Sequence, residues 1–147
     1  MEIRKLQKND KDQFSLLMKK FYQYAGEPCP TDDKLQILLE KALNKEVNFV
    51  FLGAFLANEL VGIISITFAE SSYKVSRFAW CDDLYVEESH RGKEIGTKLM
   101  QQAVVIAKKN HCASIMLGVG EKETNSQTFY KKLGFVDMKC KLMSCEL

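Results

Sequence analysis

The sequence has few of the features that mark specialised classes of protein. It contains only two histidines, and none of its five cysteines belongs to a Cys-x-x-Cys pair, so no zinc-binding spacing is present. No apolar run approaches the roughly 20 residues of a membrane-spanning helix. The opening MEIRKLQKND is too charged to be a signal peptide. These absences predict a cytoplasmic protein with no bound metal and no membrane partner.

Charge and composition are also moderate. The formal net charge of +2 is too small to indicate a nucleic-acid partner. No repeat, low-complexity tract or linker interrupts the 147 residues, and 46% of them are hydrophobic. We therefore expect one globular domain spanning residues 1–147. The odd number of cysteines predicts reduced, buried thiols.

The spacing of apolar residues predicts alternating helices and strands. Helical spacing precedes Asn48, and β-branched and aromatic runs follow it. The nearly continuous apolar character of these runs predicts a sheet with helices on both faces. The expected order begins with a strand at 1–6, a helix capped by Asn9 or Asp10 and stopped by Gly26, Pro28 and Pro30, and a helix capped by Thr31 whose apolar face runs from Leu35 to Leu43. A hairpin of strands at 49–57 and 60–68, a polar loop at 70–77 and a strand at 80–86 follow. The chain then continues with a helix from 96, a strand at 113–117, a helix at 125–133 and one or two edge strands in 135–147. This order indicates an α+β fold with a mixed sheet.

The stretch WCDDLYVEESHRGKEIGTKLM, residues 80–100, is the most informative part of the chain. It predicts a strand, a basic loop and the first turns of a helix. Backbone N–H groups and the helix dipole favour an anion at such a helix start, and Arg91, Lys93 and Lys98 surround it. A phosphate-bearing ligand is expected. The stretch matches neither the nucleotide P-loop nor the dinucleotide Gly-x-Gly-x-x-Gly fingerprint.

Two motifs resemble those of the GNAT (GCN5-related) N-acetyltransferase family. The segment Arg91-Gly92-Lys93-Glu94-Ile95-Gly96 resembles the family's Arg/Gln-x-x-Gly-x-Gly/Ala loop. The segment Phe129-Tyr130-Lys131-Lys132-Leu133-Gly134-Phe135 resembles its later Phe-Tyr-x-Lys-x-Gly-Phe motif. The resemblance covers roughly Phe49 to the C-terminus. It implies the GNAT acyl-CoA N-acyltransferase fold, a mixed α/β sandwich whose central sheet is flanked by helices.

The resemblance also implies an acetyl-coenzyme A site. The backbone of Leu84, Tyr85 and Val86 would pair with the pantetheine arm, and N–H groups near Val86 would polarise the thioester carbonyl. The loop residues expected around the pyrophosphate are Arg91, Gly92, Lys93, Glu94, Ile95, Gly96 and Thr97. Asn125 is expected as a further cofactor contact, and Tyr130 as the acid that protonates the departing thiolate. Glu94 replaces the motif's inner glycine, which predicts weakened coenzyme affinity.

The adjacent carboxylates Asp82 and Asp83 interrupt an apolar strand. In polyamine-acetylating members of the family, an acidic pair at this place contacts the amine and helps to remove its proton. An aspartate needs a raised pKa or a water relay for this task. Adjacent strand residues face opposite sides, so only one of the two is expected in the cleft. The alternative is a structural salt bridge with Arg77 or a lysine.

The sequence thus predicts direct attack of an amine on acetyl-coenzyme A within a ternary complex, without a metal. Three hypotheses follow for the acceptor. The first is a small cationic amine. The second is a protein N-terminus or lysine, which would need a groove between the two N-terminal helices and residues 70–77. The third is a silent coenzyme A-binding module, suggested by Glu94. Family resemblance also implies a possible homodimer formed through C-terminal strands.

Overall fold

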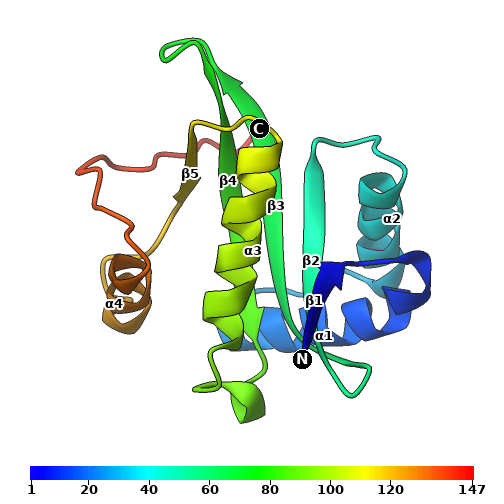
Figure 1. Ribbon diagram of the computed structural model, residues 1–147. Helices are drawn as coiled ribbons and strands as arrows, with labels where there is room; N and C mark the ends of the chain where they lie inside the picture. Colours follow the sequence, from blue (N-terminus) through cyan, green and yellow to red (C-terminus); the bar gives the residue numbers. More distant parts are fainter. The chain divides into compact units, whose positions relative to one another are not determined.

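The computed structural model describes residues 1–147, and they form two compact units, residues 1–116 and residues 117–147. The sheet has the strand order β1-β2-β3-β4-β5 (Figure 1). The strands are β1 (Glu2–Lys5), β2 (Phe49–Leu56), β3 (Glu59–Ser71), β4 (Ser76–Val86) and β5 (Ser114–Leu117). The helices are α1 (Lys11–Ala25), α2 (Asp32–Leu43), α3 (Ile95–Lys109) and α4 (Thr124–Lys132), the last of which lies in the second unit.

Strands β1 to β4 pair in antiparallel fashion with their neighbours. The turn between β2 and β3 uses Ala57 and Asn58, both of which have positive φ, as two-residue hairpins commonly require. Strand β4 reaches β5 through helix α3, a crossover that joins parallel strands. The predicted mixed sheet is therefore confirmed.

Helices cover both faces of the sheet, as the continuous apolar strands predicted. On one face, Phe51 of β2 and Ile63 of β3 share a core with Phe14 of α1 and Leu35 of α2. On the opposite face α3 packs across the sheet (Figure 1). The apolar side chains that α3 buries are Ile95, Leu99, Met100, Ala103, Ile106 and Ala107.

Gly62 of β3 allows the first turns of α3 to approach the sheet. A Cβ atom at Gly62 would lie 3.2 Å from Ile95 Cγ2 and from Leu99 Cδ1, and 3.3 Å from the backbone oxygen of Tyr85. These contacts are tighter than ordinary van der Waals contacts. The absence of a side chain at Gly62 therefore sets how closely the N-terminal end of α3 lies over β4.

A β-bulge interrupts the pairing of β3 with β4. Ser65 pairs with Asp83, but the next residue, Ile66, pairs with Cys81. Asp82 is therefore an extra residue in β4 with no partner of its own in β3. The regular alternation of side chains between the two faces is broken at this point, and the break has direct consequences for the acidic pair.

Most predicted elements are confirmed, but two expectations were wrong. Residues 135–147 form no strand, whereas one or two edge strands were expected there. The segment 70–77 is not a loop, because Glu70 pairs with Arg77 and Ser71 with Ser76 in the extended β3–β4 hairpin. Polar side chains concealed this extension, since an exposed hairpin end has no core to fill. Each helix is too short or too polar to traverse a lipid bilayer.

Candidate active site

Asp82 and Asp83 project from the same face of the sheet. The Thr67 hydroxyl donates a hydrogen bond to Asp82 Oδ2 at 2.6 Å, and the Ser65 hydroxyl donates to Asp83 Oδ2 at 2.9 Å. Ser65 and Thr67 are two residues apart in β3 and so lie on one face. The bulge explains why consecutive residues of β4 meet both hydroxyls. The expectation that only one carboxylate could face a given cleft was therefore wrong.

Neither carboxylate forms a salt bridge. Arg77, the expected alternative partner, instead lies 3.7 Å from Glu70, and no lysine is paired with either aspartate. Asp82 is exposed and Asp83 is half-buried. Two like charges thus lie side by side with only hydroxyl donors to stabilise them. This arrangement favours a bound cation.

The surroundings of Asp83 raise the pKa of its carboxyl group above the ordinary value of 3.8. Burial is the main cause, because it disfavours the charged form, and the neighbouring Asp82 charge acts in the same direction. The hydrogen bond from Ser65 opposes the shift without cancelling it. The raised pKa makes Asp83 a stronger base than an ordinary aspartate.

Tyr22 of α1 belongs to the same site, and the sequence gave no indication of it. Its ring is half-buried against the core on the face covered by α1 and α2. Burial raises the pKa of its phenol, and the negative charge of nearby Asp83 raises it further. Tyr22 therefore stays protonated and provides a hydroxyl near the acidic pair. Helical spacing alone predicted only a core role for aromatic residues of this helix.

The start of α3 has the backbone geometry expected of an anion site. The first bond within the helix runs from Lys98 N–H to the Glu94 carbonyl at 3.0 Å. The N–H groups of the preceding first turn have no partner inside the helix, and no side chain caps them. The first turn also contains no acidic residue. The N-terminus of this 15-residue helix therefore presents free donors and a positive dipole end.

The basic side chains before α3 are held by the loop itself. Arg91 Nε donates to the Val86 carbonyl at 3.0 Å, and the guanidinium lies 4.3 Å from the ring centre of Tyr24. Lys93 Nζ donates to the Ser89 carbonyl at 3.2 Å. These contacts leave the terminal guanidinium nitrogens of Arg91 available for a phosphate. The loop thus fits the phosphate-bearing ligand that the sequence predicted.

Glu94 adopts the backbone conformation that the family motif assigns to glycine. Its φ of 59° and ψ of 13° lie in the left-handed region, and its side chain is exposed. A non-glycine residue in this region costs about 1 kcal/mol. The loop therefore keeps the conformation that glycine would favour, with a carboxylate beside the anion site.

The backbone groups of the final β4 residues point alternately toward β3 and away from it. Glu87 N–H donates to the Val61 carbonyl at 2.9 Å, so by the alternation of an antiparallel ladder Tyr85 also points toward β3. Leu84 and Val86 then point toward the opposite edge. Strand β5 has four residues and begins beside Arg77, where Ala113 N–H donates to the Arg77 carbonyl at 2.8 Å. With four residues it is too short to reach Leu84, and the outward carbonyl of Val86 accepts from Arg91 Nε instead.

Tyr130 and Asn125 lie on α4 in the second unit. Tyr130 is half-buried, and its ring centre lies 5.1 Å from that of Phe129 and 5.6 Å from that of Phe135. Asn125 is exposed. The roles expected for these two residues remain predictions.

The cysteines differ from expectation in their burial. All five are free, but only Cys81 is buried, and Cys29, Cys140 and Cys145 are exposed. Burial raises the pKa of the Cys81 thiol to about 12, so this group is not a nucleophile at neutral pH. No three side chains of the metal-ligating types gather at one point.

Comparison with known proteins places the chain in a family. The sequence pattern of the acetyltransferase (GNAT) family matches residues 11–135. The chain therefore belongs to the GNAT acetyltransferase family, as the two sequence motifs indicated.

Individual relatives agree with this assignment. The thialysine N-epsilon-acetyltransferase of Bos taurus is 29% identical over 79 residues, which cover 54% of this chain and 46% of that protein. Streptothricin acetyltransferase A of Bacillus subtilis (strain 168) is 30% identical over 82 residues, or 56% of this chain and 44% of that protein. The chain thus spans less than half the length of these curated relatives.

A solved structure shows the same fold over the whole chain. The ribosomal-protein-alanine N-acetyltransferase from Brucella melitensis biovar Abortus 2308 superimposes with a TM-score of 0.82 at 20% identity, covering 99% of this chain and 100% of that one. At this level of identity the similarity defines the fold alone.

Proposed function

We propose that this protein transfers the acetyl group of acetyl-coenzyme A to a primary amine of a small cationic molecule. The amine attacks the thioester directly within a ternary complex. The observation that carries the proposal is the acidic pair. Asp82 and Asp83 share one face of the sheet and have no basic partner, and they lie near the end of β4, the strand that leads into the loop before α3.

Deprotonation of the acceptor is the first chemical requirement. An alkylamine with a pKa near 10 is neutral in only about one molecule in a thousand at pH 7. Two adjacent carboxylates attract the cationic form, and Asp83, with its raised pKa, accepts the proton directly or through water. Asp82 is exposed beside the half-buried Asp83, and its role is to orient the acceptor.

The donor is acetyl-coenzyme A, which members of this family use, and its thioester supplies the activated acetyl group. The free N–H groups at the start of α3, with Arg91 and Lys93, bind its pyrophosphate. The outward backbone groups of Leu84 and the outward N–H of Val86 pair with its extended arm, since the Val86 carbonyl already accepts from Arg91 Nε. Tyr130 protonates the departing thiolate, a suitable role for a phenol beside a thiol of pKa near 8.5. Asn125 adds a cofactor contact from the same helix.

The names of the relatives support an amine of a small molecule. One relative is named for the ε-nitrogen of thialysine and another for streptothricin. A protein acceptor is the second hypothesis, and the name of the Brucella structure describes such a reaction. The acidic pair favours the small cationic acceptor, since it concentrates two negative charges at one point and does not by itself form a groove for an extended peptide.

Two measurements on the purified protein test the proposal. Calorimetric titration with acetyl-coenzyme A measures binding, and a free-thiol assay across polyamines, aminoglycosides and lysine analogues measures transfer. Binding with thiol release on a cationic amine is the expected result. Binding without release on any small amine, but with release on a peptide, would favour the protein acceptor. Binding without any release would indicate a silent module, and no binding at all would refute the proposal.

The state of assembly is a separate prediction. A homodimer is implied by resemblance to the family, although residues 135–147 form no strand in the single chain. Light scattering of the purified protein at micromolar concentration distinguishes a mass of 16.8 kDa from twice that value.

A further inference from the structure

A cavity of about 340 Å³ lies at the other end of β4 from the loop before α3. Arg77, near the first residue of β4, lines it, whereas the loop follows Val86 at the last residue. Nine residues of extended strand separate these points by about 30 Å. The cavity is therefore distinct from the proposed acetyl-transfer site. Its volume is within the range of small-molecule sites.

The cavity lies where β1 ends early and leaves the apolar start of β2 uncovered. Strand β1 pairs only with Leu52 to Phe55 of β2, and Leu6 N–H then donates to the Phe51 carbonyl at 3.1 Å. The first residues of β2 consequently form an uncovered edge. Phe49 and Phe51 share their orientation in the ladder, so the backbone N–H of Phe49 points toward this edge, where β1 offers it no partner.

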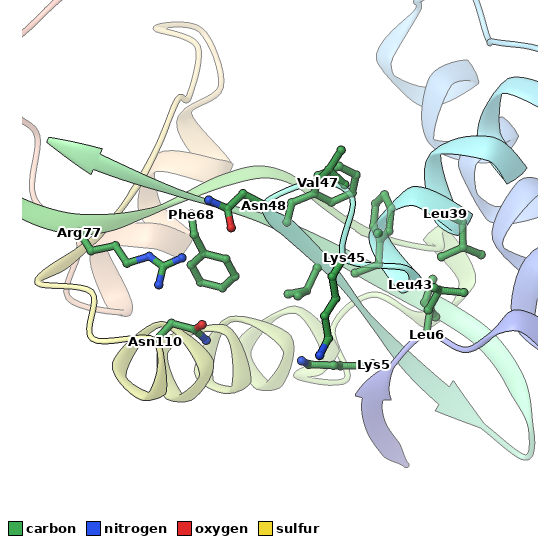
Figure 2. A pocket seen from close by; sticks show the side chains of 14 residues that line it. Lys5, Leu6, Leu39, Leu43, Lys45, Val47, Asn48, Phe68, Arg77 and Asn110 are labelled. Atoms are coloured by element: carbon green, nitrogen blue, oxygen red, sulfur yellow. The ribbon is translucent and has the colours of Figure 1, made fainter.

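Three cations surround the cavity. Figure 2 shows Lys5 and Lys45 on one side of the cavity and the guanidinium of Arg77 on the other side, beside Phe68. Neither lysine forms an ion pair in the structure. The nearest carboxylate to Arg77 is that of Glu70, at 3.7 Å from Nε, which is too long for a hydrogen bond. The buried Nε–H of Arg77 therefore lacks an acceptor.

The two helix ends beside the cavity do not account for these cations. At the end of α2, Lys45 N–H donates to the Ala42 carbonyl and Glu46 N–H donates to the Lys41 carbonyl. At the end of α3, the Asn110 amide donates to the Ile106 carbonyl at 2.9 Å. The final carbonyls are thus bonded by other groups, and the two lysine side chains remain available, while Arg77 keeps a long ion pair with the exposed Glu70.

Lys45 also occupies a backbone position that favours glycine. The two bonds at the end of α2 form a Schellman motif, and Lys45 takes its left-handed position with φ of 58°. Glycine would relieve the strain at this position. A strained residue at the rim of a cavity is a common feature of ligand sites. The chain thus keeps a cation at the point where local stability alone would favour glycine.

We propose that this cavity binds a small organic anion, a carboxylate or phosphate attached to an apolar body. Lys5, Lys45 and Arg77 pair with the anionic group, and the N–H of Phe49 and Nε–H of Arg77 donate to its oxygens. The apolar body lies on the floor formed by Phe49, Leu43 and Phe68. The same cations repel a cationic amine, so the cavity does not serve the acceptor proposed above.

The test is an NMR titration of the full ¹⁵N-labelled protein with phenyl phosphate, benzoate, inorganic phosphate and benzylamine. Saturating coenzyme A is present to occupy the loop before α3. We expect saturable shifts at the Phe49 amide and Arg77 Nε–H with phenyl phosphate or benzoate, and none with benzylamine. The tighter of the two anions identifies the preferred group. Inorganic phosphate is expected to bind at least tenfold more weakly, because it lacks the apolar body.

A matched pair of variants separates binding from folding. Lys45→Gly removes the cation and relieves positive φ, so it is expected to raise the melting temperature while weakening phenyl phosphate binding about tenfold. Lys139→Gly removes a cation from another positive-φ position that does not line the cavity, and binding should be unchanged. Equal affinity in wild type and Lys45→Gly would overturn the proposal, as would equal binding of benzylamine or non-saturating shifts spread over many lysines. A failure of coenzyme A to bind would refute the acetyl-transfer proposal but leave this titration interpretable.

Discussion

Ser65 and Asp83 exchange two hydrogen bonds across the β3–β4 pairing. The Ser65 hydroxyl donates to Asp83 Oδ2 at 2.9 Å, and the backbone N–H of Asp83 donates to Ser65 Oγ at 3.1 Å. One buried hydroxyl is thus both donor and acceptor for the same residue. This pairing fixes the direction of the carboxylate and leaves its second oxygen free to face an acceptor amine.

The raised pKa of Asp83 makes the stability of the protein depend on pH. A carboxyl group that binds its proton more tightly when folded contributes stability fully below its ordinary pKa of 3.8, and this contribution is lost as the pH rises through the folded value. The side chain of the Asp83→Asn variant cannot ionise, so the variant does not lose this stability as the pH rises. The variant is therefore expected to gain melting temperature relative to wild type at pH 7 but not at pH 3. Thermal melts across this range measure the effect.

The same substitution should abolish most of the activity. Loss of a general base typically lowers the rate by about 10² to 10⁴-fold. In the wild type, the acid limb of kcat/KM should lie above the ordinary carboxyl pKa, since the base must be ionised. Asp82→Asn is the control for charge alone, because Asp82 is exposed. It should raise KM for a cationic amine, and it should reduce the dependence of stability on pH without removing it, because the Asp82 charge contributes to the raised pKa of Asp83. A fully active Asp83→Asn would refute the assigned role.

Tyr130→Phe tests the proposed acid. The phenyl ring retains the contacts with Phe129 and Phe135, so folding is expected to be preserved. Turnover should fall by at least about 100-fold because only the hydroxyl is lost. Calorimetry should show unchanged coenzyme binding. Unaltered turnover would mean that another group, or water, protonates the thiolate.

Two substitutions of Glu94 separate its charge from its backbone strain. Glu94→Gln removes only the negative charge beside the anion loop and should tighten coenzyme A binding several-fold. Glu94→Gly also relieves the left-handed conformation, and it should bind at least as tightly as Glu94→Gln with stability changed by about 1 kcal/mol or less, since glycine adds flexibility to the unfolded chain. Dissociation constants from calorimetry measure both. Weaker binding by both variants would show that the Glu94 side chain helps the loop rather than hindering it.

Gly62→Ala tests how closely α3 must approach the sheet. The added methyl group would meet Ile95 and Leu99 of α3 and the rigid backbone oxygen of Tyr85. We expect a loss of about 1–3 kcal/mol in the free energy of unfolding, typical of an overpacked core, together with weaker coenzyme binding. Gly120→Ala is the control, because its methyl group would meet only the flexible end of Glu123. Urea denaturation of both variants measures the difference, and equal stability of the two would contradict the steric argument.

Local patterns in the sequence were enough to predict the helices and the order of the strands. The apolar spacing of Phe14, Leu17 and Met18 corresponds to the buried face of α1, and Thr31 accepts a hydrogen bond from the N–H of Lys34 as the expected cap of α2. These features depend on residues within one or two turns of each other. The motif at Arg91 to Thr97 is equally local, so the loop before α3 could be proposed as a site from the sequence alone, and its binding role stays a prediction.

Features that depend on a partner strand could not be predicted. The bulge at Asp82 arises from how β4 registers against β3, and nothing in the sequence of β4 alone marks it. For the same reason, Ser65 and Thr67 were not recognised as partners of the acidic pair. Tyr22 was missed because its role depends on which face of the sheet α1 covers. Residues 135–147 form no strand, because a strand needs a pairing partner that the local sequence does not specify.

The bulge in β4 also affects how this chain must be aligned with its relatives. In a regular strand, two carboxylates on one face stand two positions apart, but here they are consecutive because Asp82 is the extra residue. A strand that lacks the bulge aligns correctly with β4 only if a one-residue gap stands opposite Asp82, and an ungapped alignment would match one aspartate to a residue on the opposite face. Such an alignment would assign one carboxylate too few to the face that meets the acceptor, even where the sequences around it agree, and the acceptor preference inferred from it would be wrong.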